Sequence, residues 1–188
     1  MKKNKITTRQ IVFSAVAIAL AIVIATSPYT KFKWPLWFNG GSITLFSMLF
    51  VTMIGYWYGP MLGIIGALAY ALLQYITGPY FLSPLQVLLD YPLAFGALGL
   101  SGFFYQKKNG LQTGYIAGVL GRLFFHCVSG IIFYTEYVGD VKGNLMAVGA
   151  GILYNMSYII PEAVITLIVI SLPPVKKGLQ QIKQMAVS

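Results

Sequence analysis

The residues best suited to chemistry in this sequence are ionisable and polar side chains set inside long apolar stretches. They are Asp90, Arg122, His126 and Glu162, with Gln86 and Asn155 as neutral partners. An ionisable group at the centre of a bilayer costs about 2.5–3.5 kcal/mol even on the lenient insertion scale, and such groups usually face a bundle interior and have a function. These positions are therefore the first candidates for a site.

Several of these groups lie at similar depths, counted from the expected outer ends of their helices. At about 1.5 Å of rise per residue, Asp90 lies about 7 Å, His126 about 12 Å and Asn155 about 15 Å from the outside. Glu162 lies deeper, at about 25 Å by the same count. Arg122 and His126 are four residues apart, as are Gln86 and Asp90, so each pair shares a helix face. Asn155 and Glu162 are seven apart and also share a face. These faces can converge into one cavity that opens to the outside.

A buried carboxylate among aromatic rings suits a flat organic cation, because the rings attract positive charge by cation–π interaction and the carboxylate neutralises it. Histidine and asparagine can read the edge of a heterocycle by hydrogen bonding. The aromatic residues near these positions are Tyr80, Tyr91, Phe133, Tyr134, Tyr137, Tyr154 and Tyr158. The alternative is structural: Asp90 could form an ion pair with Arg122, and His126 could join two helices by a hydrogen bond.

The pattern gives little support for catalysis. Cys127 and Ser129 flank His126, but neighbouring residues on a helix point in different directions and cannot form a nucleophile–base pair. The single cysteine excludes a Cys-based metal cluster within the chain, and no Walker-type glycine loop is present to energise transport. We expect a non-enzymatic protein without a cofactor. The competing hypotheses are an intramembrane enzyme that uses His126 with Asp90 or Glu162 as acid and base, and a purely structural subunit.

Composition places these residues in a membrane. The chain has 188 residues, of which 57% are hydrophobic and 9% charged, and its mean hydropathy is +0.75. A soluble domain carries about 25% charged residues. The fold class predicted is an all-α integral membrane protein with one domain over residues 1–188. The net charge of +9 does not indicate nucleic acid, because the basic residues form short clusters between apolar runs.

Six membrane helices fit the hydropathy pattern, and a count of five or seven is the alternative. The expected helices run over about Thr8–Thr26, Ser42–Trp57, Pro60–Thr77, Leu85–Phe104, Leu111–Tyr134 and Leu145–Leu172. We interpret the first of them as a membrane helix rather than a cleaved secretory signal, because the rest of the chain is equally apolar.

The distribution of basic residues predicts that both termini lie in the cytoplasm. With the N-terminus inside, the inner segments hold nine of them: Lys2, Lys3, Lys5, Arg9, Lys107, Lys108, Lys176, Lys177 and Lys183. The outer loops hold three: Lys31, Lys33 and Lys142. Positive residues favour the cytoplasmic side.

Small residues recur at four-residue spacing, which lets helices approach closely in lipid. The rows are Gly55, Gly59 and Gly63; Gly110, Gly114 and Gly118; and Ala17, Ala21 and Ala25, the last beside Ala15 and Ala19. They predict internal packing or, for the alanine-lined first helix, a docking face for another membrane protein.

The outer loop over residues 27–41 is rich in aromatic residues and contains Trp34 and Trp37. It is either an interfacial aromatic belt or a lid over a binding site.

Four blocks of the sequence resemble a known family. They are "NGGSITL" (39–45), "TGPYFLSPLQVLLDYPLAFGALGLSGFF" (77–104), "FFHCVSGIIFY" (124–134) and "LYNMSYIIPE" (153–162). The blocks resemble the thiamine-specific substrate-binding S components of energy-coupling factor (ECF) transporters, and the resemblance covers nearly the whole chain. The blocks around "DYPLA" and "FFH…SGIIF" are its specific parts.

The resemblance implies a six-helix S component in a prokaryotic plasma membrane, with a high-affinity vitamin pocket near the extracellular side. A membrane scaffold subunit and two cytoplasmic ATPases would supply the energy, and Ala15 and Ala19 would contact the scaffold. The substrate-binding residues implied or expected are Tyr80, Asp90, Tyr91, His126, Tyr134, Asn155, Trp37 and Tyr158.

Three positions depart from the family pattern. Asp90 stands where the family has glutamate, Tyr134 where it has tryptophan, and Ala150 where it has an aromatic residue whose space Tyr154 or Tyr158 could fill. The positive charge of a thiazolium still has its counter-charge. The pocket shape can differ, so a thiamine precursor or another B vitamin stays an alternative ligand. Arg122 could offset a carboxylate or contact a hydroxyl or phosphate tail of the ligand.

Overall fold

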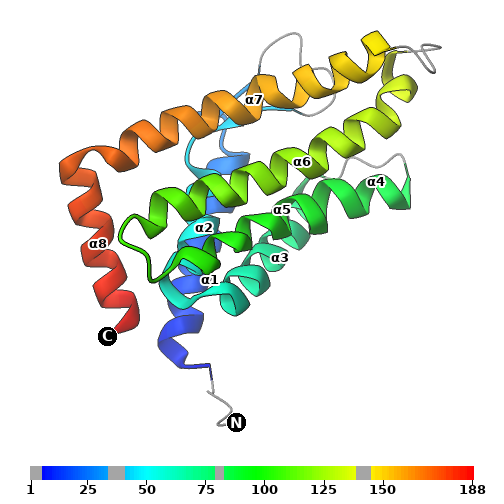
Figure 1. Cartoon of the computed structure of the whole chain (residues 1–188). Coiled ribbons are helices and arrows are strands. Elements are labelled where there is room, and N and C mark those ends of the chain that lie inside the picture. Colours follow the sequence, from blue (N-terminus) through cyan, green and yellow to red (C-terminus); the bar gives the residue numbers. More distant parts are fainter. Residues whose placement is uncertain (1–5, 34–40, 79–82, 139–144) are drawn as a thin grey trace.

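The fold is a bundle of helices with one short strand pair (Figure 1). The computed structural model describes residues 6–33, 41–78, 83–138 and 145–188, without the side chains of 134–138 and 145–147. The elements are α1 (Thr8–Thr26), β1 (Lys31–Phe32), β2 (Ile43–Thr44), α2 (Ser47–Tyr58), α3 (Pro60–Thr77), α4 (Pro84–Leu88), the π-helical η1 (Leu89–Leu93), α5 (Ala94–Gly96), the 3₁₀-helical η2 (Ala97–Phe104), α6 (Gly110–Val138), α7 (Leu145–Ser171) and α8 (Pro173–Val187).

The all-helical membrane fold class is confirmed. Within the described residues, five helical stretches are long and apolar enough to cross a membrane: α1, α3, the continuous run from α4 to η2, α6 and α7. The remaining expected helix, the second along the chain, corresponds to α2. It has 12 residues and is about 18 Å long, shorter than a usual membrane span. The count of six spans and the cytoplasmic position of both termini stay predictions. The termini do lie at one end, since Arg9 Nη1 donates to Ser188 Oγ at 2.9 Å.

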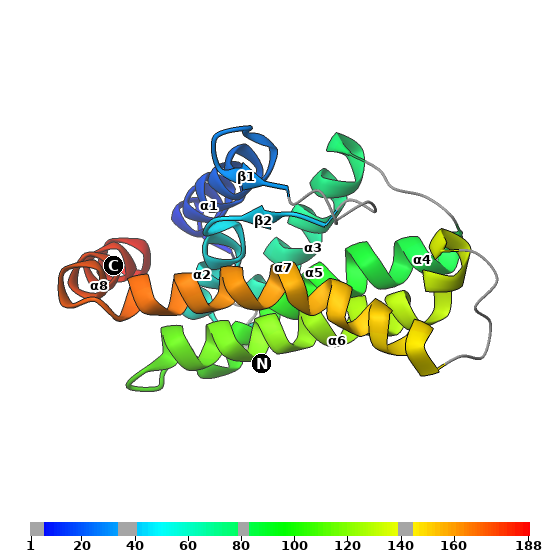
Figure 2. The ribbon, with the colours of Figure 1, turned by 90° about the horizontal axis from the view of Figure 1, so that it is seen from above.

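One expectation about the elements is wrong, and one helix was not expected. The second helix begins at Ser47 rather than Ser42, because residues 43–44 form a strand in which Thr44 pairs with Lys31. The unexpected element is α8, an amphipathic helix that the hydropathy pattern does not reveal because six of its 15 residues are Lys or Gln. It lies beside α7 at the end of the bundle that holds the C-terminus (Figure 2). Lys183 fixes it there, with Nζ donating to the Tyr105 carbonyl at 2.6 Å and lying 3.8 Å from the centre of the Tyr56 ring.

The glycine rows serve internal packing, as one of the two interpretations predicted. A Cβ atom on Gly63 would lie 2.7 Å from the Cα of Gly55, and one on Gly102 would lie 2.4 Å from the carbonyl carbon of Gly59. Only glycine permits α2, α3 and η2 to approach this closely. On α1, the row from Ala17 to Ala25 faces the bundle and is buried.

The helix that carries Asp90 changes geometry at Pro92. Proline has no N–H and its ring clashes with the carbonyl four residues earlier, so a regular α-helix cannot continue through it. The chain widens into a π-helical turn over Leu89–Leu93, in which the N–H of Ala94 donates to the carbonyl of Leu89. Such turns inside α-helices often occur at functional sites, and here the turn holds Asp90 and Tyr91.

Candidate ligand-binding site

A cavity of about 210 Å³ opens at the end of the bundle opposite the two termini. It is formed by the end of α1, the β1–β2 pair, α3, the α4–α5 run, α6 and α7. The polar side chains on its wall are Lys31, Ser42, Thr44, Gln74, Gln86, Asp90, Arg122, His126, Ser129 and Asn155. The aromatic ones are Tyr70, Tyr91, Phe95, Tyr154 and Tyr158. The size and lining suit a small organic molecule.

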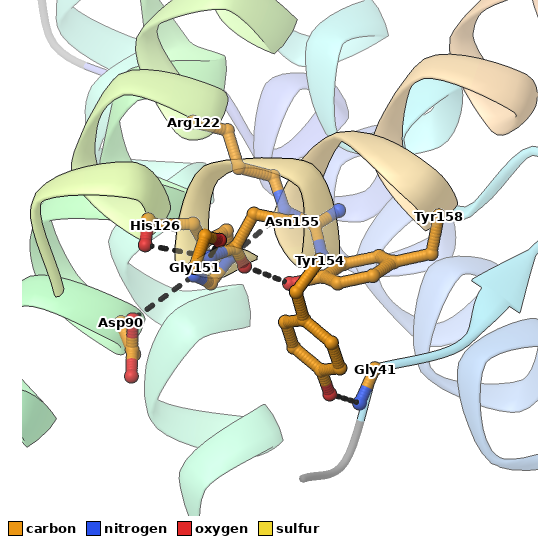
Figure 3. A network of polar contacts seen from close by, with 8 residues as sticks. All are labelled: Gly41, Asp90, Arg122, His126, Gly151, Tyr154, Asn155 and Tyr158. Carbon is orange, nitrogen blue, oxygen red and sulfur yellow. Dashed lines mark hydrogen bonds and ion pairs between the residues drawn. The ribbon is translucent and has the colours of Figure 1, made fainter. Parts of the chain in front are cut away.

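Asp90, His126 and Arg122 form one chain of contacts along the wall (Figure 3). Nδ1 of His126 lies 3.0 Å from Oδ1 of Asp90, and Nε of Arg122 donates to Nε2 of His126 at 3.3 Å. The expected alternative of a direct Asp90–Arg122 ion pair is therefore wrong: the histidine stands between them. The guanidinium also lies 4.6 Å from the centre of the Phe95 ring, in cation–π contact.

The contacts of His126 determine its charge. An arginine nitrogen can only donate, so Nε2 of His126 must accept. An imidazole that accepts at Nε2 and bonds a carboxylate at Nδ1 is neutral and carries its proton at Nδ1. His126 therefore donates to Asp90 and adds no positive charge to the cavity. One oxygen of Asp90 receives this bond, and the side chain is 21% exposed toward the cavity.

Asn155 joins α6 to α7. Its Nδ2 donates to the His126 carbonyl at 2.9 Å and to the Gly151 carbonyl at 3.0 Å, and its Oδ1 accepts from the hydroxyl of Tyr158 at 2.6 Å. Both amide hydrogens are thus used within the protein, and an oxygen lone pair is what this side chain can offer a ligand. The main structural role of Asn155 is to connect α7 to the backbone of α6 at His126.

A row of aromatic rings follows the cavity wall from α4 to α7. Tyr91 lies 6.2 Å from Phe95, and Phe95 lies 6.1 Å from the ring of His126, centre to centre. The row continues from His126 to Tyr158 at 6.5 Å and from Tyr158 to Tyr154 at 5.6 Å. Tilted and edge-to-face pairs of this kind are favourable, and the four aromatic side chains of the row line the cavity, where a flat ligand can contact them.

Asn155 lines the cavity but Glu162 does not, so the expectation that their shared helix face converges there is wrong for Glu162, which is bonded by protein instead. Its Oε2 accepts from the Thr44 N–H at 3.0 Å and the Thr44 hydroxyl at 3.2 Å, and its Oε1 accepts from the Ser47 hydroxyl at 3.3 Å. The side chain is 1% exposed. These hydrogen bonds connect strand β2 and the start of α2 to α7.

The structure brings together five of the eight residues expected to bind substrate. All five line the cavity described above: Asp90, Tyr91, His126, Asn155 and Tyr158. Tyr80 and Trp37 lie outside the described residues. Tyr134 belongs to α6, and its side chain is not among those described.

Sequence reasoning missed several lining residues. Phe95 and Ser129 follow Tyr91 and His126 by four and three residues, so helical spacing could have found them. Lys31 carries no such signal, because its place on the wall depends on the strand pair. In the described part of the chain, no three His, Cys, Asp or Glu side chains group as metal ligands.

Comparison with known proteins finds a matching family model and two related sequences. Residues 11–181 match the model of the family described as thiamine transporter protein (Thia_YuaJ). A relative from Bacillus subtilis (strain 168), "Thiamine transporter ThiT", is 30% identical over 148 residues, covering 71% of this chain and 75% of that protein. A protein of the same description from Lacticaseibacillus paracasei is 27% identical over 139 residues, covering 66% of this chain and 67% of its own length.

A solved structure shares the fold. It is that of ThiT from Listeria monocytogenes, which superposes with a TM-score of 0.61 and 23% sequence identity. The match covers 88% of this chain and 93% of that one. At this identity the likeness establishes the arrangement of helices.

Proposed function

Because this chain belongs to the thiamine transporter protein family, we propose that its cavity captures thiamine for an ECF-type importer. The family makes it a transport protein rather than an enzyme, a thiamine-binding S component that crosses a prokaryotic membrane several times. The coupling to an ECF scaffold and two ATPases, the extracellular opening of the cavity and the plasma membrane as its location are parts of the proposal.

The observation that carries the proposal is the carboxylate of Asp90 on the cavity wall. Among the described lining residues Asp90 is the carboxylate, and its side chain is bonded to His126, which is neutral by its contacts. A cation in the cavity would pair with it. The thiazolium of thiamine carries its charge at every pH, and Asp90 is the carboxylate that it can reach.

The row of rings supplies the second part of the recognition. Thiamine has two flat heterocycles, and the aromatic residues Tyr91, Phe95 and Tyr158 line the same cavity as Asp90. Stacking and cation–π contact favour a ring that is both flat and positively charged. A neutral vitamin would gain the stacking and lose the charge pairing.

Calorimetric titration of the purified protein tests this proposal. We expect saturable binding of thiamine at one site per chain and a thiamine-dependent rise in the melting temperature. The neutral isostere of thiamine with a benzene-type central ring serves as the control, and we expect it to bind at least tenfold more weakly. Equal affinity for the two compounds would contradict the charge argument, and no binding at micromolar thiamine would contradict the assignment of the ligand.

We place the scaffold contact on the outer face of α1. Ala15 and Ala19 are exposed there, whereas Ala17 and Ala21 face the bundle. An exposed small-residue face lets a partner helix approach closely. Ala19→Trp should reduce co-purification with a scaffold subunit and leave thiamine affinity unchanged. Co-purification at the level of the unmodified protein would exclude this face.

A further inference from the structure

The end of the bundle that holds the two termini carries a cluster of positive charge. Two segments supply it, the turn between η2 and α6 and the helix α8, and we call their five lysines the basic platform: Lys107, Lys108, Lys176, Lys177 and Lys183. The sequence has four acidic side chains, and none of them lies in residues 103–112 or 172–188. The segments that carry these charges therefore do not balance them.

Contacts hold the two segments of the platform side by side, and Figure 1 shows α8 next to the turn that precedes α6. Nζ of Lys176 donates to Oδ1 of Asn109 at 3.5 Å, and Nζ of Lys183 donates to the Tyr105 carbonyl at 2.6 Å. Lys183 is thus used to position α8. Lys108 and Lys177, in contrast, are exposed, and their ammonium groups are available to a partner outside the chain.

A small hollow lies between the two segments. Its polar lining consists of Lys108, Gln112, Lys176 and Gln180. A lysine ammonium offers three donors and no acceptor, and a glutamine amide offers two donors. No carboxylate is among the described residues that line this hollow. Two ammonium groups beside one hollow suit a group that is anionic and rich in acceptor oxygens, as a phosphate is.

The platform lies where lipid headgroups are expected. Two membrane-span candidates end just before it, at Phe104 and at Ser171. Lys108 follows the first end by four residues and Lys176 follows the second by five. The same segments also expose large apolar side chains: Phe103, Leu172, Met185 and Val187. Lysines beside exposed apolar side chains are typical of an element that lies in a membrane interface, which favours a lipid over a dissolved anion.

We propose that the basic platform binds anionic phospholipid headgroups of the membrane leaflet at this end of the bundle, with Lys108 and Lys176 contacting one lipid phosphate. Lysine clusters directly beside a membrane span attract anionic lipids. The bound phosphate joins α8 to the turn before α6, in addition to the contact between Lys176 and Asn109. This inference does not depend on which molecule occupies the cavity at the other end of the bundle.

Melting of the full chain in a neutral detergent tests the proposal, with phosphatidylglycerol as the anionic lipid and phosphatidylcholine as the zwitterionic one. We expect phosphatidylglycerol to raise the melting temperature by several degrees in a saturable way, since it binds the folded state. Phosphatidylcholine should give less than about a third of that rise, because its headgroup has no net charge. Equal rises with the two lipids would overturn the proposal.

Two substitutions locate the site. Lys108→Gln and Lys176→Gln should each weaken the apparent affinity for phosphatidylglycerol about fivefold, and the double variant about 25-fold. The melting temperature without lipid should stay within about 2 °C of that of the unmodified protein, because both side chains lie at the surface. The double substitution to arginine keeps both charges and should keep the affinity. Unchanged affinity in the double glutamine variant would overturn the assignment to this platform.

Lys33 provides a matched control. It is an exposed lysine that follows β1, near the cavity at the other end of the bundle. Lys33→Gln should change the affinity for phosphatidylglycerol by less than about twofold, because an exposed charge at that distance is screened by salt. A loss equal to that of Lys108→Gln would show that net charge, and not the platform, attracts the lipid, and would overturn the proposal.

Glycerol 3-phosphate distinguishes a lipid from a free phosphate. It carries the phosphate but no acyl chains, so it cannot contact the apolar side chains around the platform. At the concentration at which phosphatidylglycerol saturates, it should give no rise in the melting temperature. A rise equal to that with the lipid would show a site for a dissolved anion and would contradict the assignment to a membrane surface.

Discussion

Asp90 and Glu162 are both carboxylates inside a membrane bundle, but their surroundings differ. Glu162 receives three hydrogen bonds from Thr44 and Ser47 and is 1% exposed. Within the described residues Asp90 accepts one hydrogen bond, from His126, and its side chain is 21% exposed to a cavity. One carboxylate has its acceptor capacity filled by the protein, and the other keeps acceptor capacity for a ligand.

The difference shows how to separate structural from functional charges at membrane depth. Both residues are carboxylates in apolar sequence, where such groups are rare, so their rarity does not distinguish them. The distinguishing property is the number of donors that the protein itself supplies. A satisfied carboxylate should contribute to stability, and an unsatisfied one to binding.

The largest effect should come from Asp90→Asn. The amide keeps the size and can still accept from His126, but it removes the negative charge. We expect thiamine affinity to fall by about 2–4 kcal/mol, which is roughly 30- to 1000-fold, measured by calorimetry. The melting temperature without ligand should hardly change. Asp90→Glu, which keeps the charge, is the control, and an equal loss in both variants would show that shape rather than charge decides.

Glu162→Ala should give the reverse result. It removes the acceptor of the Thr44 N–H and leaves the hydroxyls of Thr44 and Ser47, 2.7 Å apart, with only each other as partners, so the free energy of unfolding should fall by about 3 kcal/mol. The melting temperature should drop by about 6–12 °C, and thiamine affinity of the folded protein should stay within about threefold. A large loss of affinity without loss of stability would make Glu162 part of the binding site.

Thr166→Val on the same helix is the matched control for Glu162. The Thr166 hydroxyl is buried and makes no hydrogen bond with the described part of the chain. Its removal should change stability by less than about 1 kcal/mol. A fall as large as that of Glu162→Ala would mean that any buried polar change on α7 is harmful.

The smallest effect should come from Tyr158→Phe, which connects the two regions. It removes the 2.6 Å bond to Asn155 and keeps the ring on the cavity wall. We expect about 1 kcal/mol of lost stability and up to about fivefold weaker thiamine binding. Tyr115→Phe, which removes a buried hydroxyl with no such bond in the described residues, should affect neither. Unchanged behaviour of both variants would show that Asn155 needs no support from Tyr158.

Much of this protein could be predicted from its sequence. Apolar runs long enough to span a bilayer predicted the ends of α1 and α3 to within a residue. The reason is that a helix satisfies the hydrogen bonds of its own backbone in lipid. Helical spacing and depth counting also selected Asp90, His126 and Asn155 as one group, and these residues line one cavity.

Other features had no local signal. The strand pair depends on residues 31–32 meeting residues 43–44, and α8 is held by contacts with Tyr56, Tyr58 and Tyr105, far away along the chain. The sequence also could not predict that His126 lies between Asp90 and Arg122. Periodicity indicates which face of a helix a residue lies on, but not which side chain lies between two others.

The sequence by itself determined that this is a helical membrane protein with costly charges at shared depths, since hydrophobicity and helical period are properties of local composition. Only the tertiary structure decided which carboxylate has its hydrogen bonds supplied by the protein and which keeps acceptor capacity for a ligand. That depends on donors such as Thr44 and His126, which come from other segments of the chain and reach Glu162 and Asp90 only when the bundle has packed.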